Sequence, residues 1–236
     1  LRSPLTAIRG ELELALRRNR EPEEYREVLR SAREEVVRLG RIVEGLLVLA
    51  RSDSGAIQTR LQRVDLRELV WRAVDRASSE FGTRRVRLDI VAPDEVPGLF
   101  DLDLVEQLTG NLIENAVRYA GEGGKVRVSV SRGEAAAVLS VEDSGPGLPP
   151  GSEEEAFERF WRADPSRTQS ERSAGTGLGL AIVKVIAEAH GGSVSASNNS
   201  SLGGASLVVE LPLMPLACDS SGIESGALGL ADPSAV

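Results

Sequence analysis

The chain has 236 residues, of which 41% are hydrophobic and 27% charged, and this suits one large or two modest packed domains. Its formal net charge of −8 and its lack of a basic tract argue against nucleic acid as a main partner. Cys218 is the only cysteine, which excludes an internal disulfide framework and fits a reducing compartment, and no apolar run is long enough to span a membrane.

Residues 1–53 are expected to form a helical hairpin, with Pro22 suited to a turn or to the start of the second helix. Apolar residues recur every three or four positions in both helices, which predicts a seam for bundle packing. Because two helices alone cannot bury such a seam on both sides, we expect dimerisation into a four-helix bundle. The alternative is that the hairpin docks on its own downstream domain. The seam residues are Leu5, Ile8, Leu12, Ala15, Leu29, Ala32, Val36, Leu39, Val43, Leu46 and Ala50.

Residues 54–60 are expected to be a linker, residues 61–212 a second domain, and residues 213–236 a disordered tail. In the second domain Asp65 is a candidate N-cap for the first helix. The interleaved pattern predicts an α/β sandwich, with helices on one face of a mixed sheet, and hence an α+β chain. The expected helices are 65–80, 102–119 and 178–190, and the expected strands are 86–92, 125–131, 136–143, 192–197 and 205–211.

The first candidate site lies on the predicted helix 102–119. Asn111 and Asn115 are one turn apart on one face, and Arg118 and Tyr119 follow on nearly the same stripe. Amide oxygens can ligate a hard divalent metal, the cation can meet phosphate, and the ring can cover a base. Taken alone, the stripe is equally compatible with a polar helix face in water.

A second candidate site follows the predicted strand 136–143. Asp143 stands at the end of this strand, where its carboxylate can accept a hydrogen bond from an exocyclic amine. Gly145 and Gly147 allow the backbone to turn tightly and to approach a ligand closely. The alternative is an ordinary loop, since this stretch is rich in turn formers.

Residues 156–164 concentrate the aromatic side chains Phe157, Phe160 and Trp161, which helical spacing would place on one side. Such a cluster is more typical of a core than of a ligand contact. We expect the polar run 164–174, which follows Arg162, to form a mobile flap hinged on this cluster.

A glycine-rich segment then opens the predicted helix 178–190. It exposes backbone N–H groups and the positive end of the helix dipole, which suits phosphate. Its spacing differs from the dinucleotide fingerprint, and it lacks the Gly-Lys-Ser/Thr of a P-loop. The residues are Gly175, Thr176, Gly177, Leu178, Gly179 and Leu180.

In this order the four segments resemble the ATP-binding core of the sensor histidine kinases of two-component systems. Residues 111–119 are similar to the N box of that family, 143–147 to the first G box, 157–160 to the F box and 175–183 to the second G box. Four motifs in register are far more specific than any one of them. The resemblance runs from residue 1 to about residue 212. It implies a dimeric four-helix bundle followed by an α/β sandwich of the GHKL type, the fold shared with gyrase and Hsp90.

The resemblance also implies ATP and Mg²⁺ as ligands. Asp143 would accept the adenine amine, Tyr119 would pack on the base, and Asn115 would ligate Mg²⁺. Asn111 would lie near the phosphates, at the position where the related ATPases carry a water-activating Glu, so slow hydrolysis is expected.

Arg118 and Arg162 would meet phosphate charge and, with Asn111, form the implied catalytic set. The other implied ATP contacts are Gly145, Gly147, Phe160, Gly175, Thr176, Gly177, Leu178, Gly179 and Leu180.

The family's phospho-accepting histidine would lie two positions before Leu1, and it is not in this chain. Ser3 occupies the position that orients water for dephosphorylation in the family. His190 is the only histidine, and with Gly191 and Gly192 after it we expect a helix cap there. The chain is therefore expected to bind ATP without phosphorylating itself at the family's site, and to be a fragment of a longer protein.

The leading hypothesis is the catalytic core of a histidine kinase, which passes the γ-phosphate of ATP to a histidine and then to a response-regulator aspartate. The alternative is a truncated nucleotide-binding and dimerisation module without autokinase activity. A Ser/Thr kinase is disfavoured because residues 1–6 match the histidine-phosphorylating layout. The implied partners are a second copy of the chain and a receiver domain. The implied location is the cytoplasmic portion of a membrane-anchored parent protein, which would touch the membrane only through other segments.

Overall fold

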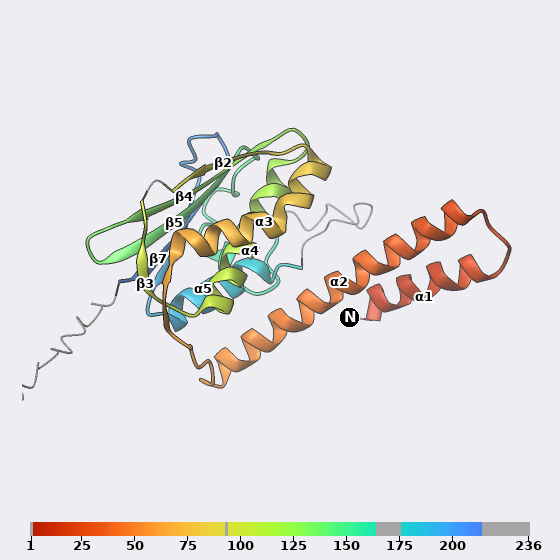
Figure 1. Cartoon of the computed structure of the whole chain (residues 1–236), viewed down its shortest axis with the longest axis horizontal. Helices are drawn as coiled ribbons and strands as arrows, with labels where there is room; N and C mark the ends of the chain where they lie inside the picture. Colours follow the sequence, from red (N-terminus) through yellow and green to blue (C-terminus); the bar gives the residue numbers. More distant parts are fainter. Residues whose placement is uncertain (1, 93, 164–175, 214–236) are drawn as a thin grey trace, which may run out of the picture.

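An antiparallel helical hairpin opens the computed structural model, which describes residues 2–92, 94–163 and 176–213 (Figure 1). Its helices are α1 (Arg2–Leu16) and α2 (Pro22–Asp53). Pro22 begins α2, where a missing N–H leaves no helical hydrogen bond unmade. Ala15 and Ala32 are buried in the hairpin, and Ser31 donates a hydrogen bond of 2.8 Å to Glu11. The predicted hairpin is confirmed.

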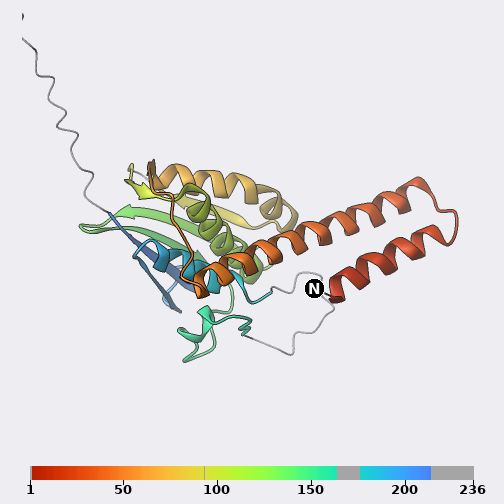
Figure 2. The ribbon, with the colours of Figure 1, turned by 90° about the horizontal axis from the view of Figure 1, so that it is seen from below.

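A five-stranded sheet forms the centre of the second unit, in the order β2-β4-β5-β7-β6. Strands β2 and β4 are parallel, and every other neighbouring pair is antiparallel. Helices α3, α4 and α5 cover one face of the sheet (Figures 1 and 2), so the predicted sandwich of a mixed sheet and one helical layer is confirmed. The bounds are α3 Leu66–Arg84, β2 Arg87–Val91, α4 Leu102–Ala120, β4 Lys125–Arg132, β5 Ala136–Asp143, α5 Gly179–Ala189, β6 Ser193–Ser197 and β7 Ser206–Pro212.

A second, two-stranded sheet of β1 (Gln62–Asp65) and β3 (Pro97–Phe100) was not predicted. Each strand has four residues, which is too few for alternation to stand out in the sequence. Asp65 connects this sheet to α3, because its Oδ1 accepts hydrogen bonds from the N–H groups of Arg67 at 3.0 Å and Val96 at 2.9 Å. The bond from Arg67 is the N-cap bond expected of Asp65.

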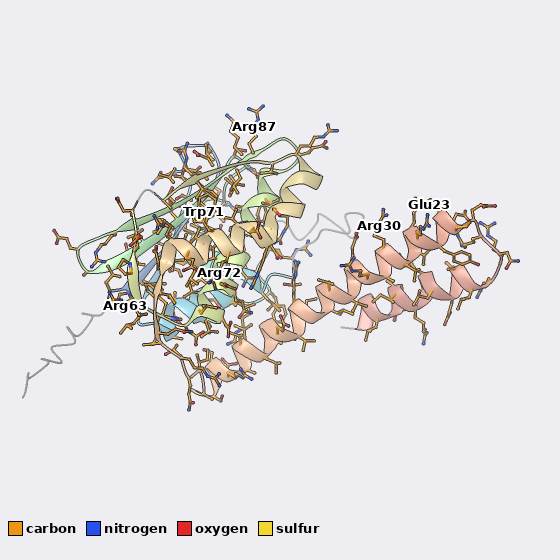
Figure 3. The ribbon with its side chains drawn as sticks, viewed as in Figure 1. Glu23, Arg30, Arg63, Trp71, Arg72 and Arg87 are labelled. Carbon is orange, nitrogen blue, oxygen red and sulfur yellow. The ribbon has the colours of Figure 1, made fainter. Side chains whose placement is uncertain are left out.

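A buried carboxylate joins α3 to α4. Glu106 of α4 is almost fully buried, and its carboxylate lies 2.8 Å from a guanidinium nitrogen of Arg76 and 3.7 Å from one of Arg72. Figure 3 shows Arg72 on α3, while Glu23 and Arg30 lie on the part of the hairpin farthest from the sheet. A buried carboxylate needs such partners, so these arginines fix α4 against its neighbour.

The last third of α2 packs on α5, as both views show (Figures 1 and 2). Leu49 is only 3% exposed and belongs to the main core. Gly45 allows close contact, because a Cβ there would lie 2.6 Å from Cδ1 of Ile182. The hairpin therefore does dock on its own downstream domain.

Two ion pairs flank this contact. Arg41 of α2 pairs with Glu114 of α4, and Asp53 at the end of α2 accepts a hydrogen bond of 2.7 Å from Arg159. All four side chains are substantially exposed to solvent, so each pair adds little stability and mainly fixes where α2 lies.

A separate apolar stripe of α2 remains exposed. Val43 lies two positions before the docked Gly45, and Leu47 lies two positions before the docked Leu49. Two positions correspond to about 200° around a helix, so the exposed side chains point away from the docked face. Leu29 and Val36 continue the exposed stripe. A second copy that packed on this stripe would therefore contact a different face of α2 from the docked one, and the two contacts would not exclude each other. No helix among the described residues is long and apolar enough to cross a membrane.

Leu49→Ala tests the docking contact. Truncating a fully buried leucine should lower the free energy of unfolding by about 2–3 kcal/mol, measured by urea denaturation. Arg51→Ala changes an exposed residue close to Leu49 on α2. The free energy of unfolding of this variant should stay within about 0.5 kcal/mol of that of the unaltered protein. Equal effects of the two substitutions would mean that Leu49 does not anchor α2 to the core.

Candidate functional site

The predicted polar stripe of α4 lies at the boundary between core and solvent. Asn111, Asn115, Arg118 and Tyr119 are all partly exposed, while the opposite side of the helix is buried. The Nδ2 atom of Asn111 is buried and has no hydrogen-bond partner among the described residues. The guanidinium carbon of Arg118 lies 5.9 Å from the centre of the Tyr119 ring. Asn111 thus offers a donor that a bound group would satisfy.

Asp143 ends β5 and is only 2% exposed. Its Oδ1 accepts hydrogen bonds from the N–H groups of Gly145 at 2.8 Å and Ala205 at 3.4 Å. Burial raises the pKa of this carboxyl, and the two backbone donors lower it by less. Oδ2 accepts no hydrogen bond from the described residues. One oxygen is therefore fixed by the fold, and the other is left for a donor outside it.

The glycines after Asp143 bring its loop against the end of α4. A Cβ on Gly145 would lie 2.5 Å from the carbonyl oxygen of Tyr119. Gly147 has a φ of +78°, which glycine adopts without strain. The loop that follows Asp143 therefore packs against the backbone of Tyr119 at the end of α4.

The turn between β6 and β7 holds Asp143 from the other side, and this contribution was missed at the sequence level. Gly204 donates its N–H to the Asp143 carbonyl at 3.1 Å, and the Ser200 hydroxyl donates to the same carbonyl at 3.0 Å. Any side chain at position 204 would collide with the Asp143 carboxylate. The adjacent glycines 203 and 204 were the available signal, but no role was predicted for them.

The start of α5 lies over Asn111. A Cβ on Gly179 would be 3.7 Å from Oδ1 of Asn111. Leu178, the N-cap residue, is buried and provides no side-chain cap, and Thr176 accepts a hydrogen bond of 3.3 Å from the Leu178 N–H. Leu180 lies in the first turn and packs against the core. An uncapped helix start above an unpaired amide donor provides two independent signs of an anion site.

The aromatic segment departs from the helix expected for it. Only Glu155–Phe157 forms a 3₁₀ turn, η1, and Phe157 is buried. Phe160 is 64% exposed with a φ of +64°, and its N–H bonds to the carbonyl of Gly177 at 2.8 Å. The expectation that the aromatics share one helical side is wrong, because the backbone is already extended at Glu158, with a ψ of 150°, and the turn ends at Phe157.

The remaining predicted residues lie at the edge of the described part of the chain or outside it. Arg162 is exposed at the end of the described segment. Gly175, the proposed flap 164–174 and the tail from residue 214 lie outside the described residues. Ser3 is in α1, but its side chain is not among those described.

His190 has the structural role predicted for it. Its Nδ1 donates to the Ile186 carbonyl at 2.8 Å, and its Nε2 accepts from the Asp101 N–H at 3.0 Å. This pattern requires the neutral ring. Asp101 in turn caps α4 by accepting from the Leu104 N–H at 3.1 Å. The histidine therefore connects the end of α5 to the start of α4. The candidate site lies toward the other ends of these two helices.

The residues present fit a nucleotide with a magnesium ion. Asp143 can meet an exocyclic amine, and Asn111 with the start of α5 can meet phosphate. The described residues contain no cluster of three or more His, Cys, Asp or Glu side chains suited to a metal ion. Mg²⁺ does not need one, since it keeps several waters and often binds through phosphates plus one or two protein oxygens.

Comparisons with known proteins agree with this arrangement. Residues 1–55 match the family model of the His Kinase A (phospho-acceptor) domain, and residues 100–215 match the histidine kinase-, DNA gyrase B-, and HSP90-like ATPase. A crystal structure of full-length ShkA in complex with AMPPNP has a TM-score of 0.68 and 27% identity, covering 90% of this chain and 43% of that chain.

The chain is also similar to proteins named as sensor kinases. It is 38% identical over 215 residues to the signal transduction histidine-protein kinase BaeS of Escherichia coli, and 36% identical over 192 residues to the sensor protein IrlS of Burkholderia pseudomallei. The matches cover 90% and 81% of this chain but only 44% and 40% of those relatives, so it spans less than half of their length. The two family models, the motifs and the fold agree: the chain belongs to the sensor histidine kinases of two-component systems.

Proposed function

We propose that this chain is the catalytic core of a two-component histidine kinase that binds Mg-ATP and passes the γ-phosphate to a histidine, and then to a response-regulator aspartate. The observation that carries the proposal is the unpaired Nδ2 of Asn111 beneath the uncapped start of α5. The AMPPNP bound to the structural relative ShkA supports ATP as the nucleotide.

At the base end, Asp143 selects adenine. Its Oδ2 accepts from the exocyclic amine, while Oδ1 stays bound to Gly145 and Ala205. Tyr119 packs on the face of the base, and Arg118, whose guanidinium lies over the Tyr119 ring, supplies positive charge for the phosphates. Because Asp143 is buried, a base without the amine would leave a desolvated carboxylate unpaired.

At the phosphate end, Asn111 and the first N–H groups of α5 bind phosphate oxygens. Asn115, one turn further along α4, would supply an oxygen ligand to Mg²⁺, which would neutralise phosphate charge. Arg118 and Arg162 add positive charge for phosphoryl transfer, a reaction that needs positioning and charge neutralisation more than covalent chemistry.

The site favours transfer to an acceptor over hydrolysis. Asn111 has no basic lone pair with which to activate water. Glu114 is the nearest carboxylate in sequence, but it points away from the stripe and pairs with Arg41 of α2. The nucleotide therefore keeps its γ-phosphate until an acceptor histidine arrives.

Two partners follow from this function. A second copy of the chain covers the exposed stripe of Leu29, Val36, Val43 and Leu47 and completes a four-helix bundle. A receiver domain then takes the phosphoryl group from the histidine.

The second candidate function is a nucleotide-binding and dimerisation module without autokinase activity. It is favoured by His190, which is buried and hydrogen-bonded through both ring nitrogens. The accepting histidine must therefore come from outside these 236 residues.

Adding His-Glu before Leu1 distinguishes the two functions. The extended chain should incorporate phosphate from γ-labelled ATP in an acid-labile, alkali-stable form, because the acceptor position of the family is then present. The chain as it stands and an extended Asp143→Ala variant are the controls, and both should remain unlabelled. An unlabelled extended chain that still binds ATP would support the module instead.

Asn115→Ala should remove the magnesium dependence of nucleotide binding. Titration calorimetry with a non-hydrolysable ATP analogue should show an affinity gain of about 10-fold or more from Mg²⁺ in the unaltered protein, and almost none in the variant. Asp103→Ala, an exposed change in the first turn of α4, is the control. A full magnesium effect in Asn115→Ala would exclude this residue as a ligand.

Asp143→Asn should weaken ATP binding by about 100-fold, because an amide N–H₂ would face the adenine amine. The asparagine Oδ1 still accepts from Gly145 and Ala205, so the fold should survive. Asp75→Asn, an exposed change on α3, is the matched control and should leave binding unaltered.

The same substitution should alter the pH dependence of stability without nucleotide. Since burial raises the pKa of Asp143 above 3.8, the native state binds this proton more tightly than the unfolded chain does. The contribution of Asp143 to the free energy of unfolding therefore falls as the pH rises from 3.8 through the raised pKa. Urea denaturation should find Asp143→Asn at least as stable as the unaltered protein at pH 7, with that gain lost below pH 3.8. A loss of stability at pH 7 would contradict the burial cost.

A further inference from the structure

Asn198, directly after β6, makes a two-point contact that none of the sequence motifs includes. Its Oδ1 accepts from the Leu148 N–H at 2.7 Å, and its Nδ2 donates to the Leu148 carbonyl at 2.9 Å. The side-chain amide thus satisfies both backbone groups of one residue, much as a neighbouring strand would. Leu148 is fifty positions away in sequence, so the contact links two separate segments of the chain.

Leu148 closes the loop that begins after Asp143. At the start of this loop, Gly145 donates to Asp143 Oδ1, and Ser144 donates to the Lys125 carbonyl at 3.0 Å. At the far end, Asn198 bonds Leu148 and lies against Gly147, where a Cβ would be 2.6 Å from the Asn198 Oδ1. The loop is therefore held at both ends.

Gly145 of the same loop also touches α4, the helix that carries Tyr119. Gly145 lies close to the Tyr119 carbonyl, and Gly147 adopts its positive φ just before Leu148. Glycine-rich backbone has many accessible conformations, so a loop freed at one end would spend less time in this one. The contact of the Gly145 backbone with the Tyr119 carbonyl, beside the Asp143 carboxylate, depends on that conformation.

We propose that Asn198 is a positioning residue for adenine recognition. Its amide fixes residues 144–148 so that Asp143 Oδ2 and the Tyr119 ring meet the base together. Asn198 acts through the Leu148 backbone and does not touch the nucleotide. The proposal rests on the proposed function, since it needs ATP as the ligand, and it adds a determinant of base selectivity on the β6–β7 turn.

The experiment compares ADP with IDP, whose hypoxanthine base lacks the amine that Asp143 accepts. Titration calorimetry should show that Asn198→Ala weakens ADP binding by about 10-fold, because two preorganising hydrogen bonds are lost. IDP binding should weaken by only about 2-fold, since IDP does not use the Asp143 contact. The selectivity for ADP over IDP should therefore fall by about 5-fold.

Two further variants sharpen the comparison. Asn198→Asp keeps an acceptor for the Leu148 N–H but loses the donor, so its selectivity should lie between those of the alanine variant and the unaltered protein. This variant also serves if Asn198→Ala does not fold. Asn199→Ala alters the next, equally exposed side chain of the turn and should leave both affinities unchanged.

A purely structural role gives a different result. Melting temperature without nucleotide would then fall in Asn198→Ala and Asn198→Asp while the ADP-to-IDP ratio stayed constant, and this would overturn the proposal. If the unaltered protein failed to bind ADP, the proposed function itself would be wrong. If it bound ADP and the variants kept its selectivity, only the role of Asn198 would be lost.

Discussion

The burial of one carboxylate, that of Asp143, is the constraint on which the rest of the site depends. Its Oδ1 receives backbone N–H groups from Gly145 and Ala205, and these come from loops on opposite sides of the end of β5. The remaining oxygen is left in a desolvated position, where pairing with a donor is worth more than in water. Burial thereby raises the pKa of the Asp143 carboxyl, and it also leaves an oxygen suited to accept a hydrogen bond from the proposed base.

The two ends of the site are built by different means and joined by α4. The proposed base end comes from the sheet and its loops, where Gly145 and Gly204 permit backbone contacts that any larger residue would prevent. The proposed phosphate end comes from the start of α5, which reaches Asn111. Because Asn111 and Tyr119 are on one helix, about 12 Å of rigid rod sets the spacing between the ends. The bond between Asp101 and His190 holds α5 against that rod at the far side.

Much of this arrangement could be predicted from the sequence because it follows from local patterns. Alternating apolar residues identified the strands of the main sheet, and helical periodicity placed Asn111 and Asn115 on one side of α4. The exposed position of Phe160 could not be predicted, because its backbone bonds to Gly177, and no local sequence pattern connects these two residues. Asn198 was missed for a similar reason. Its partner is a backbone group fifty positions away, and an asparagine in a turn ordinarily satisfies itself locally.

The docking of α2 combines buried apolar contacts with two exposed ion pairs, and this arrangement matters for the proposed transfer of phosphate to a histidine. Leu49 is buried in this contact and contributes about 2–3 kcal/mol, and Ile42, Leu46 and Val48 of α2 pack partly buried against the same core. The pairs Arg41–Glu114 and Asp53–Arg159 are solvent-exposed and add at most about 1 kcal/mol each. These contacts together favour the docked arrangement of α2 over a released one. Since the exposed stripe of α2 is on another face, a four-helix bundle formed through that stripe would not depend on the docked contact.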